Sequence, residues 1–210
     1  MKKTILIKGQ PFYYEAEELV FAGGPEITFE QAQEVLFRAK EILDRLGIRF
    51  WLIYGTLLGA VRENSFISHD FDVDIQTDMI EETIAAIPVF DAAGMKLIRV
   101  DPGRILTFRI EEGAYIDIYF KRRAPFPLNL WCTWLNGNIV PKKLFRGLTE
   151  MQFLGRTFMV PQAPERLLEF FYGKSWHTPI KGVHGRYDIY PVYAYRKLKK
   201  EISNIFKKHG

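Results

Sequence analysis

A short segment in which acidic and apolar residues alternate, His69–Ile75, constrains the fold more than any other part of the chain. Such alternation is typical of a β-strand, because successive side chains of a strand point to opposite faces of its sheet. The apolar side chains of this segment therefore share one face and can pack against a helix. The opposite face carries Asp70, Asp72 and Asp74. The sequence thus predicts a strand that is buried on one side and strongly negative on the other.

The acidic face of this strand predicts a metal site. Three carboxylates on one face repel each other and resist burial unless a positive charge offsets them. Same-face residues of a strand lie roughly 6–7 Å apart, so the side chains of Asp72 and Asp74 can converge on one Mg²⁺ or Mn²⁺ ion, or on a pair of ions about 4 Å apart. The alternative is an edge strand whose acidic face is solvated.

A further carboxylate, Asp117, lies in the middle of the apolar and aromatic run Tyr115–Phe120. Buried carboxylates are rare unless they are paired or bound to a metal. If this strand neighbours the acidic one, Asp117 reaches the same site, either as a third metal ligand or as the base that accepts a proton from an acceptor hydroxyl. The alternative is an ion pair with Arg104 or Arg109.

The segment Tyr54–Arg62 predicts a site for phosphate groups. It ends a strand, turns at Gly55-Thr56 and begins a helix, whose first backbone N–H groups are free to bind an anion. The Thr56 hydroxyl can add a hydrogen bond, and Arg62 can neutralise phosphate or pair with Asp70. Together with the two acidic strands, this turn has the layout of a nucleotidyltransferase-fold site.

Helix and strand patterns predict an α/β (α+β) fold with a mixed sheet flanked by helices. The clearest helix covers residues 28–46, where Thr28 and Gln31 have the form of a capping box. A nucleotidyltransferase-like catalytic core is expected over residues 1–122. Further elements are expected as a helix over residues 79–93 and strands over residues 48–54, 95–100, 105–110 and 114–120.

Residues 123–210 are expected to form a helical and hairpin extension packed on this core. The pattern changes at Pro125 and Pro127, which interrupt regular structure. The extension ends in a basic amphipathic helix over residues 192–207. Its other expected elements are a strand over residues 128–135, a tight turn at Asn136-Gly137, a hairpin over residues 152–160 that turns at Gly155-Arg156, and a helix over residues 165–172.

Composition excludes several classes of protein. Of the 210 residues, 48% are hydrophobic and 26% are charged, which excludes a disordered or collagen-like chain. No transmembrane helix or secretory signal is expected, and the single cysteine, Cys132, favours a reducing compartment, the cytoplasm. Residues 192–210 carry six Lys or Arg against one Glu. This tail is expected to be a solvated helix or to contact anionic membrane lipid at the inner membrane face; nothing predicts nucleic-acid binding.

Two motifs in the expected order resemble the LicD family, which includes bacterial phosphocholine transferases and the fukutin and fukutin-related proteins. Tyr54–Arg62 followed by Phe66–Ile75 resembles the family signature, and Val160–Pro179 resembles its closing pattern. The resemblance covers roughly residues 35–180. One departure is that Ser68-His69 stands where the family usually has Pro-Trp, which bears on the choice of alcohol or acceptor more than on the metal chemistry.

The resemblance implies a nucleotidyltransferase-type fold and a metal-dependent phosphotransferase of cell-surface polysaccharide biosynthesis. It would move phosphocholine, ribitol phosphate or a similar group from a CDP-linked alcohol to a hydroxyl of a glycan or lipid-linked sugar and release CMP. Asp72 and Asp74 would bind the metal with Asp117 as the third acidic residue. The resemblance also implies that donor phosphates contact Gly55 and Thr56 and that Arg62 and Asp70 belong to the signature. Arg62 is a further candidate for binding donor phosphate, His69 is a candidate for contact with donor or acceptor, and His177 is a candidate for the lining of the acceptor cleft.

Two alternatives remain open at this point. A nucleotidyltransferase that attaches NMP to an acceptor and releases pyrophosphate would use the same acidic strands. A non-catalytic module that binds a glycan or an anionic lipid would not need the complete set of carboxylates.

Overall fold

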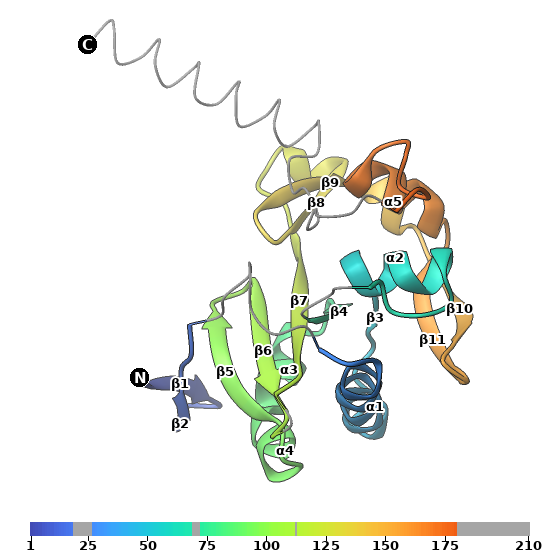
Figure 1. Ribbon diagram of the computed structural model, residues 1–210. Coiled ribbons are helices and arrows are strands. Elements are labelled where there is room, and N and C mark those ends of the chain that lie inside the picture. Colours follow the sequence, from blue (N-terminus) through green and yellow to red (C-terminus); the bar gives the residue numbers. More distant parts are fainter. Residues whose placement is uncertain (19–26, 69–71, 112, 180–210) are drawn as a thin grey trace, which may run out of the picture.

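The centre of the computed structural model is a mixed sheet (Figure 1). Five strands lie side by side in the order β3 (Trp51–Leu52), β4 (Val73–Thr77), β7 (Tyr115–Arg123), β6 (Ile105–Arg109) and β5 (Lys96–Asp101). Among these five, β4 and β7 run parallel and the other neighbouring pairs are antiparallel. The expected mixed α/β fold is confirmed. The structure describes residues 1–18, 27–68, 72–111 and 113–179.

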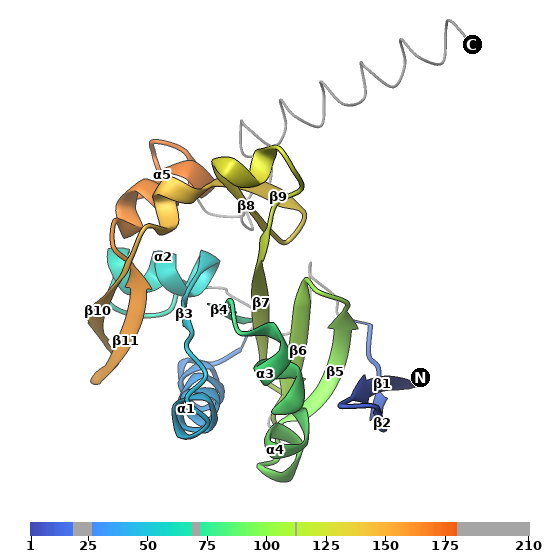
Figure 2. The same ribbon diagram turned by 180° about the vertical axis from the view of Figure 1, so that it is seen from behind.

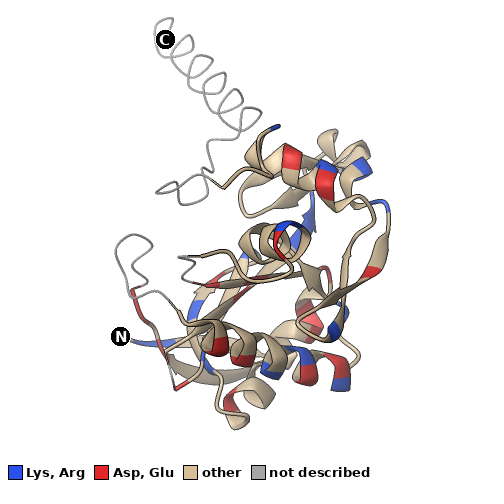
Figure 3. Ribbon diagram, turned by 45° about the vertical axis from the view of Figure 1, so that its right-hand side comes forward, with Lys and Arg blue, Asp and Glu red and all other residues tan. Residues whose placement is uncertain are grey.

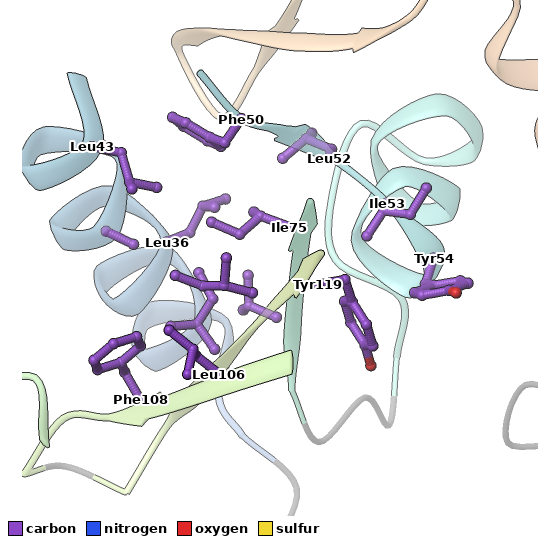
Figure 4. Close-up of a cluster of buried hydrophobic side chains, with 14 of the residues drawn as sticks. Leu36, Leu43, Phe50, Leu52, Ile53, Tyr54, Ile75, Leu106, Phe108 and Tyr119 are labelled. Carbon is purple, nitrogen blue, oxygen red and sulfur yellow. The ribbon is translucent and has the colours of Figure 1, made fainter. Parts of the chain in front are cut away.

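Helices lie on both sides of this sheet. Helix α1 (Phe29–Arg45) and helix α4 (Ile87–Ala92) contact one another and cover one face. Helix α2 (Tyr54–Arg62) packs on β4 from the other side. Figure 4 shows the two sides: Leu36 and Leu43 of α1 face Ile75, whereas the rings of Tyr54 and Tyr119 lie on the side of α2.

Helix α1 forms where its sequence pattern predicts it. The Thr28 hydroxyl accepts a hydrogen bond from the Gln31 backbone N–H at 3.2 Å, and the Gln31 side chain accepts one from the Thr28 N–H at 2.9 Å. This capping box satisfies backbone donors that the first turn of a helix leaves free. The apolar face of α1 is buried through Ala32, Val35, Leu36, Ala39, Ile42 and Leu43.

Two elements of the core differ from the sequence-based prediction. The helix expected over residues 79–93 is two short helices, α3 (Ile80–Ala85) and α4, because Pro88 is accepted in the first turn of α4 but not inside a continuous helix. The N-terminal residues form a hairpin of β1 (Lys2–Ile7) and β2 (Gln10–Glu15), which was not predicted and whose second strand packs beside β5.

Strand β7 leads out of the main sheet into the extension (Figure 2). Its last three residues, Lys121–Arg123, pair with β8 (Cys132–Leu135), which pairs in turn with β9 (Asn138–Pro141). The tight turn at Asn136-Gly137 is confirmed. The first part of the strand expected over residues 128–135 is instead a 3₁₀ turn, η1 (Leu128–Leu130), in which the Leu130 N–H donates to the Pro127 carbonyl and the Trp131 N–H donates to the Leu128 carbonyl.

The remaining elements of the extension pack against the core. They are η2 (Lys142–Phe145), the hairpin of β10 (Leu148–Phe153) and β11 (Arg156–Pro161), and helix α5 (Pro164–Tyr172). The hairpin turns at Leu154-Gly155, one residue before the predicted position. Helix α5 ends at Gly173 as predicted and packs on α2. The expected helix over residues 192–207 lies outside the described residues, and none of the described helices is long and apolar enough to cross a membrane.

A close backbone approach at Gly59 of α2 leads to a prediction for stability. A Cβ atom at this position would lie 2.3 Å from the Ser65 carbonyl oxygen and 3.0 Å from the Ile67 nitrogen. Because both are backbone atoms, Gly59→Ala should lower the free energy of unfolding by about 1–3 kcal/mol despite the better helix propensity of alanine. Urea denaturation measures this change.

Gly147→Ala is the matched control, since the nearest atom to its Cβ would be the end of the flexible Gln162 side chain, at 3.0 Å, and not a backbone atom. Equal stability of the Gly59→Ala and Gly147→Ala proteins would contradict the prediction.

Candidate functional site

Parallel pairing of β4 with β7 brings the two acidic strands together. Asp74 lies directly opposite Asp117 in this register, and Asp72 precedes β4 on the same side. One carboxylate oxygen from each of the three residues lies within 4.8 Å of the others. Asp74 is 4% and Asp117 is 1% exposed, whereas Asp72 is half-buried. The predicted convergence of Asp72, Asp74 and Asp117, which we call the acidic triad, is therefore confirmed.

The alternative role of Asp117, an ion pair with Arg104 or Arg109, is wrong. Arg104 pairs with Asp101 at 2.9 Å, and Arg109 pairs with Glu17 at 2.6 Å. Both arginines are therefore engaged with other carboxylates, and the Asp117 carboxylate lies beside those of Asp72 and Asp74.

Two hydroxyl groups hold the Asp117 carboxylate in place. The Thr107 hydroxyl on β6 donates a hydrogen bond to one oxygen, and the Tyr119 hydroxyl donates to the other at 3.2 Å. Burial and, second, the charge of Asp72 raise the pKa of Asp117 to about 7, although Thr107, Arg99 and Tyr119 act in the opposite direction. The metal-free site is therefore short of positive charge.

The Gly55-Thr56 turn supports the triad from the start of α2. The Gly55 backbone N–H donates to the Asp74 carboxylate at 3.0 Å, and the Asp74 backbone N–H donates to the Thr56 hydroxyl at 2.8 Å. Both residues are buried. A helix N-terminus favours an anion, and in this structure the carboxylate of Asp74 is that anion. The turn predicted to hold donor phosphates thus also fixes a carboxylate of the triad.

Aromatic side chains pack against one another beside Asp117. Tyr54 has φ +46°, an uncommon conformation for a residue other than glycine, and it begins α2 directly before Gly55. Its ring centroid lies 4.9 Å from that of Tyr119 and 4.9 Å from that of Phe171 on α5. The extension therefore contributes packing to the element that positions Asp74.

The other predicted site residues lie apart from this cluster or outside the described residues. Arg62, in the last turn of α2, pairs with the neighbouring Glu63 and donates to the Trp176 carbonyl at 3.4 Å. His177 is exposed, with its ring edge-on to Trp176 at 5.8 Å. His69 and Asp70 lie outside the described residues.

The chemistry of the triad fits a hard divalent cation. Carboxylate oxygens are the ligands that Mg²⁺ and Mn²⁺ prefer. Ligand oxygens on opposite sides of one Mg²⁺ are about 4.2 Å apart, close to the 4.8 Å within which the triad oxygens lie. A cation would also supply the positive charge that the raised pKa of Asp117 calls for. The triad can therefore hold a metal ion.

Three residues that position or surround Asp117 were not identified from the sequence. Thr107 and Tyr119 hold its carboxylate, and Arg99 on β5 favours its charged form. Tyr119 shares the strand face of Asp117, so the alternation of β7 contained that signal. Thr107 and Arg99 lie on other strands, and only the register of the sheet relates them to Asp117.

Comparison with known proteins agrees with this geometry. Residues 47–163 match the family described as LicD/FKTN/FKRP, nucleotidyltransferase domain. The chain belongs to this family. The matched region contains the Gly55-Thr56 turn, both acidic strands and the β10–β11 hairpin, so the family resemblance is confirmed; the closing pattern over residues 160–179 lies mostly beyond the match.

Curated members of this family share about a third of their length with the chain. Ribitol-5-phosphate transferase FKTN of Mus musculus is 30% identical over 158 residues, which are 72% of this chain and 34% of the relative. FKTN of Homo sapiens is 28% identical, with the same coverage, and ribitol 5-phosphate transferase FKRP of Homo sapiens is 23% identical over 63% of this chain and 29% of its own.

Solved structures with a similar fold are nucleotidyltransferases. The lincomycin-bound lincosamide antibiotic adenylyltransferase LnuA has a TM-score of 0.51 at 16% identity, over 71% of this chain and 89% of its own. The antibiotic-resistance factor ANT(2'')-Ia has a TM-score of 0.50 at 12% identity, over 87% of this chain and 98% of its own. At these identities the likeness shows the nucleotidyltransferase-like fold alone.

Proposed function

We propose that the chain is a metal-dependent phosphotransferase that moves a phospho-alcohol from a CDP-linked donor to a hydroxyl of a glycan or lipid-linked sugar. The observation that carries the proposal is the acidic triad beside the Gly55-Thr56 turn, in a chain of the LicD/FKTN/FKRP family. The ribitol phosphate transferase names of the relatives favour this class of donor. The chain matches only about a third of the length of those relatives, so their activity is a proposal for this chain.

Each residue of the site has a separate task in this proposal. Asp72 and Asp74 hold a Mg²⁺ or Mn²⁺ ion, which when bound neutralises charge on the donor diphosphate. The Gly55 N–H keeps Asp74 oriented, and Thr107 and Tyr119 keep Asp117 oriented. Arg62 adds positive charge at the far end of α2. There its ion pair with Glu63 can be replaced by an ion pair with a donor phosphate.

The proposed transfer is a single displacement at phosphorus. The acceptor oxygen forms a bond to the phosphorus that bears the alcohol, and the bond from that phosphorus to the bridging diphosphate oxygen breaks. CMP leaves with the electron pair. Asp117, buried and with a pKa near 7 before any cation binds, is placed to accept the hydroxyl proton or to complete the ligand set.

Donor binding and product identity test this function. Thermal shifts are measured for CDP-choline, CDP-ribitol, CDP-glycerol and nucleoside triphosphates, each with and without Mg²⁺. One CDP-linked alcohol should raise the melting temperature in a Mg²⁺-dependent way, because a ligand that binds only the native state stabilises it. With that donor and a glycan acceptor, CMP is the expected product.

Release of pyrophosphate from a nucleoside triphosphate would replace this function with nucleotidyl transfer. Absence of any Mg²⁺-dependent shift with every nucleotide compound would instead favour a non-catalytic binding module.

A further inference from the structure

A short loop between β7 and β8 places large apolar side chains in solvent. Phe126 is 81% exposed and Trp131 is 66% exposed, and between them lie Leu128 and Leu130, which are 37% and 55% exposed. These four account for almost half of the large hydrophobic side chains that are exposed among the described residues. We call residues 125–131 the apolar loop. Single exposed apolar residues are ordinary, but a contiguous group is typical of an interaction site.

The backbone of the apolar loop is satisfied by internal hydrogen bonds. The N–H groups of Asn129, Leu130 and Trp131 donate to carbonyls three or four residues earlier, at 3.0–3.1 Å. The Trp131 carbonyl accepts from the Lys142 N–H at 2.8 Å, which ties the loop to η2. The loop therefore presents its side chains from a fixed scaffold, with these polar backbone groups already paired, as an apolar environment requires.

The sequence around the apolar loop is strongly basic. No acidic residue occurs between Asp117 and Glu150, whereas that interval contains six cations, Lys121, Arg122, Arg123, Lys142, Lys143 and Arg146. In α1, by contrast, acidic and basic residues are interspersed and form pairs such as Lys40–Asp44 (Figure 3).

Three of these cations flank the loop without forming an ion pair with any described residue. Arg123 precedes the loop on β7, and Lys142 and Lys143 are joined to its end through the Trp131 carbonyl. Lys143 also borders a hollow of about 770 Å³ toward α5, whose charged lining is Lys143, Arg146 and Arg166 with one acidic residue, Glu169. The apolar loop is thus bordered on both sides by exposed cations that pair with no carboxylate of the described residues.

We propose that the apolar loop and its flanking cations bind the surface of an anionic lipid bilayer. Phe126 and Trp131 would enter the interfacial region, where aromatic rings are favoured, and Leu128 and Leu130 would reach the acyl boundary. Arg123, Lys142 and Lys143 would contact anionic headgroups. This surface contains none of the residues of the acidic triad, so the proposal does not depend on the proposed reaction.

The composition of the loop favours a bilayer over a nucleic acid. Bases stack on aromatic rings, and Phe126 and Trp131 alone would offer that contact. The aliphatic side chains of Leu128 and Leu130 gain from an apolar medium and have no such role with bases. These apolar side chains are exposed on a loop and do not line a groove of the described residues, which suits insertion into an interface.

Flotation with lipid vesicles tests the proposal on the full chain. The vesicles are phosphatidylcholine alone and phosphatidylcholine with about 30% phosphatidylglycerol, each at low and high salt. Binding is expected to the anionic vesicles and to weaken with salt. Phe126→Ser combined with Trp131→Ser should lower the partition coefficient at least about tenfold, because two exposed rings lose their apolar environment. Lys142→Gln combined with Lys143→Gln should lower it about tenfold at low salt.

Matched controls come from the β1–β2 hairpin, which also carries exposed apolar residues and lysines. Leu6 is 67% and Tyr13 is 71% exposed, so Leu6→Ser with Tyr13→Ser removes a similar exposed apolar surface. Lys2→Gln with Lys3→Gln removes the same charge. Both control proteins should bind vesicles within about twofold of the unmodified chain. All four variants are at exposed positions, and their melting temperatures are compared to establish that each is folded.

Five results would overturn the proposal. The first is undiminished flotation of the Phe126→Ser, Trp131→Ser protein, which would assign any binding to another part of the chain. The second is an equal loss in the hairpin controls. The third is the absence of binding to anionic vesicles. The fourth is that the unmodified chain is a dimer and the Phe126→Ser, Trp131→Ser protein is a monomer, which would show that the apolar loop binds a second copy of the chain. Displacement from vesicles by single-stranded RNA at equal charge concentration would likewise overturn it in favour of a nucleic acid.

Discussion

Replacement of Asp72 with Asn is expected to lower the rate of CMP release at least about a thousand-fold while the protein stays folded. Asp72 is the half-buried member of the acidic triad, and asparagine keeps its shape but removes the negative charge that would hold the cation. The measurement is CMP formation from the CDP-linked alcohol that stabilises the protein, together with Mn²⁺ affinity determined by calorimetry. Both should fall.

Asp78→Asn is the matched control for this substitution. Asp78 lies just beyond β4 and pairs with Arg49 at 2.9 Å and with Lys121 at 3.5 Å, outside the triad. Its replacement removes an identical charge, so CMP release should stay within about threefold of the unmodified protein although some stability is lost. If Asp72→Asn retained more than about a tenth of the activity, the triad would not be the metal site of the reaction.

The metal-free protein is expected to lose stability as the pH rises from about 4 to about 7. The ordinary pKa of an aspartate is 3.8, and burial followed by the charge of Asp72 raises that of Asp117 to about 7. Between these values the native protein binds one proton more than the unfolded chain. The free energy of unfolding therefore falls by about 1.4 kcal/mol per pH unit, up to about 4 kcal/mol in all, through this carboxyl group.

Asp117→Asn isolates this effect from other titrating groups. Without divalent cations at pH 8, the variant should be more stable than the unmodified protein by about 2–4 kcal/mol, because it lacks the buried charge. The difference should vanish near pH 4. Mg²⁺ should stabilise the unmodified protein increasingly as the pH rises and should stabilise the variant less, because the variant keeps only Asp72 and Asp74 of the triad. Urea denaturation across pH, with and without Mg²⁺, gives these values, and parallel pH profiles for both proteins would contradict the assignment.

Local sequence patterns predict the elements that carry the acids. The alternation around Asp72 and Asp74 identifies a strand and its negative face, and the isolated charge of Asp117 marks a second strand. These patterns arise from the two-residue period of a strand, which is a local property. The capping box of α1 and the Gly173 terminus of α5 were predicted for the same reason, since both are set by residues within one turn.

Pairing between distant strands decides which side chains meet at the site, and local sequence patterns do not predict it. That β4 runs parallel to β7, with Asp74 opposite Asp117, depends on the whole sheet and was only a hypothesis before the fold was known. The contacts of Thr107 and Arg99 with the environment of Asp117 follow from the same register. The β1–β2 hairpin was missed although its strands are local, because its residues are largely exposed and lack a clear apolar period.

The contact between Tyr54 and Phe171 sets a lower limit on the length of chain that can fold as an intact unit. The family match ends at residue 163, yet Phe171 is 2% exposed and its ring lies 4.9 Å from that of Tyr54. A protein shortened to the matched region would expose Tyr54, at the start of the helix whose next N–H holds Asp74. Expression for structural or biochemical work should therefore retain α5 and Gly173.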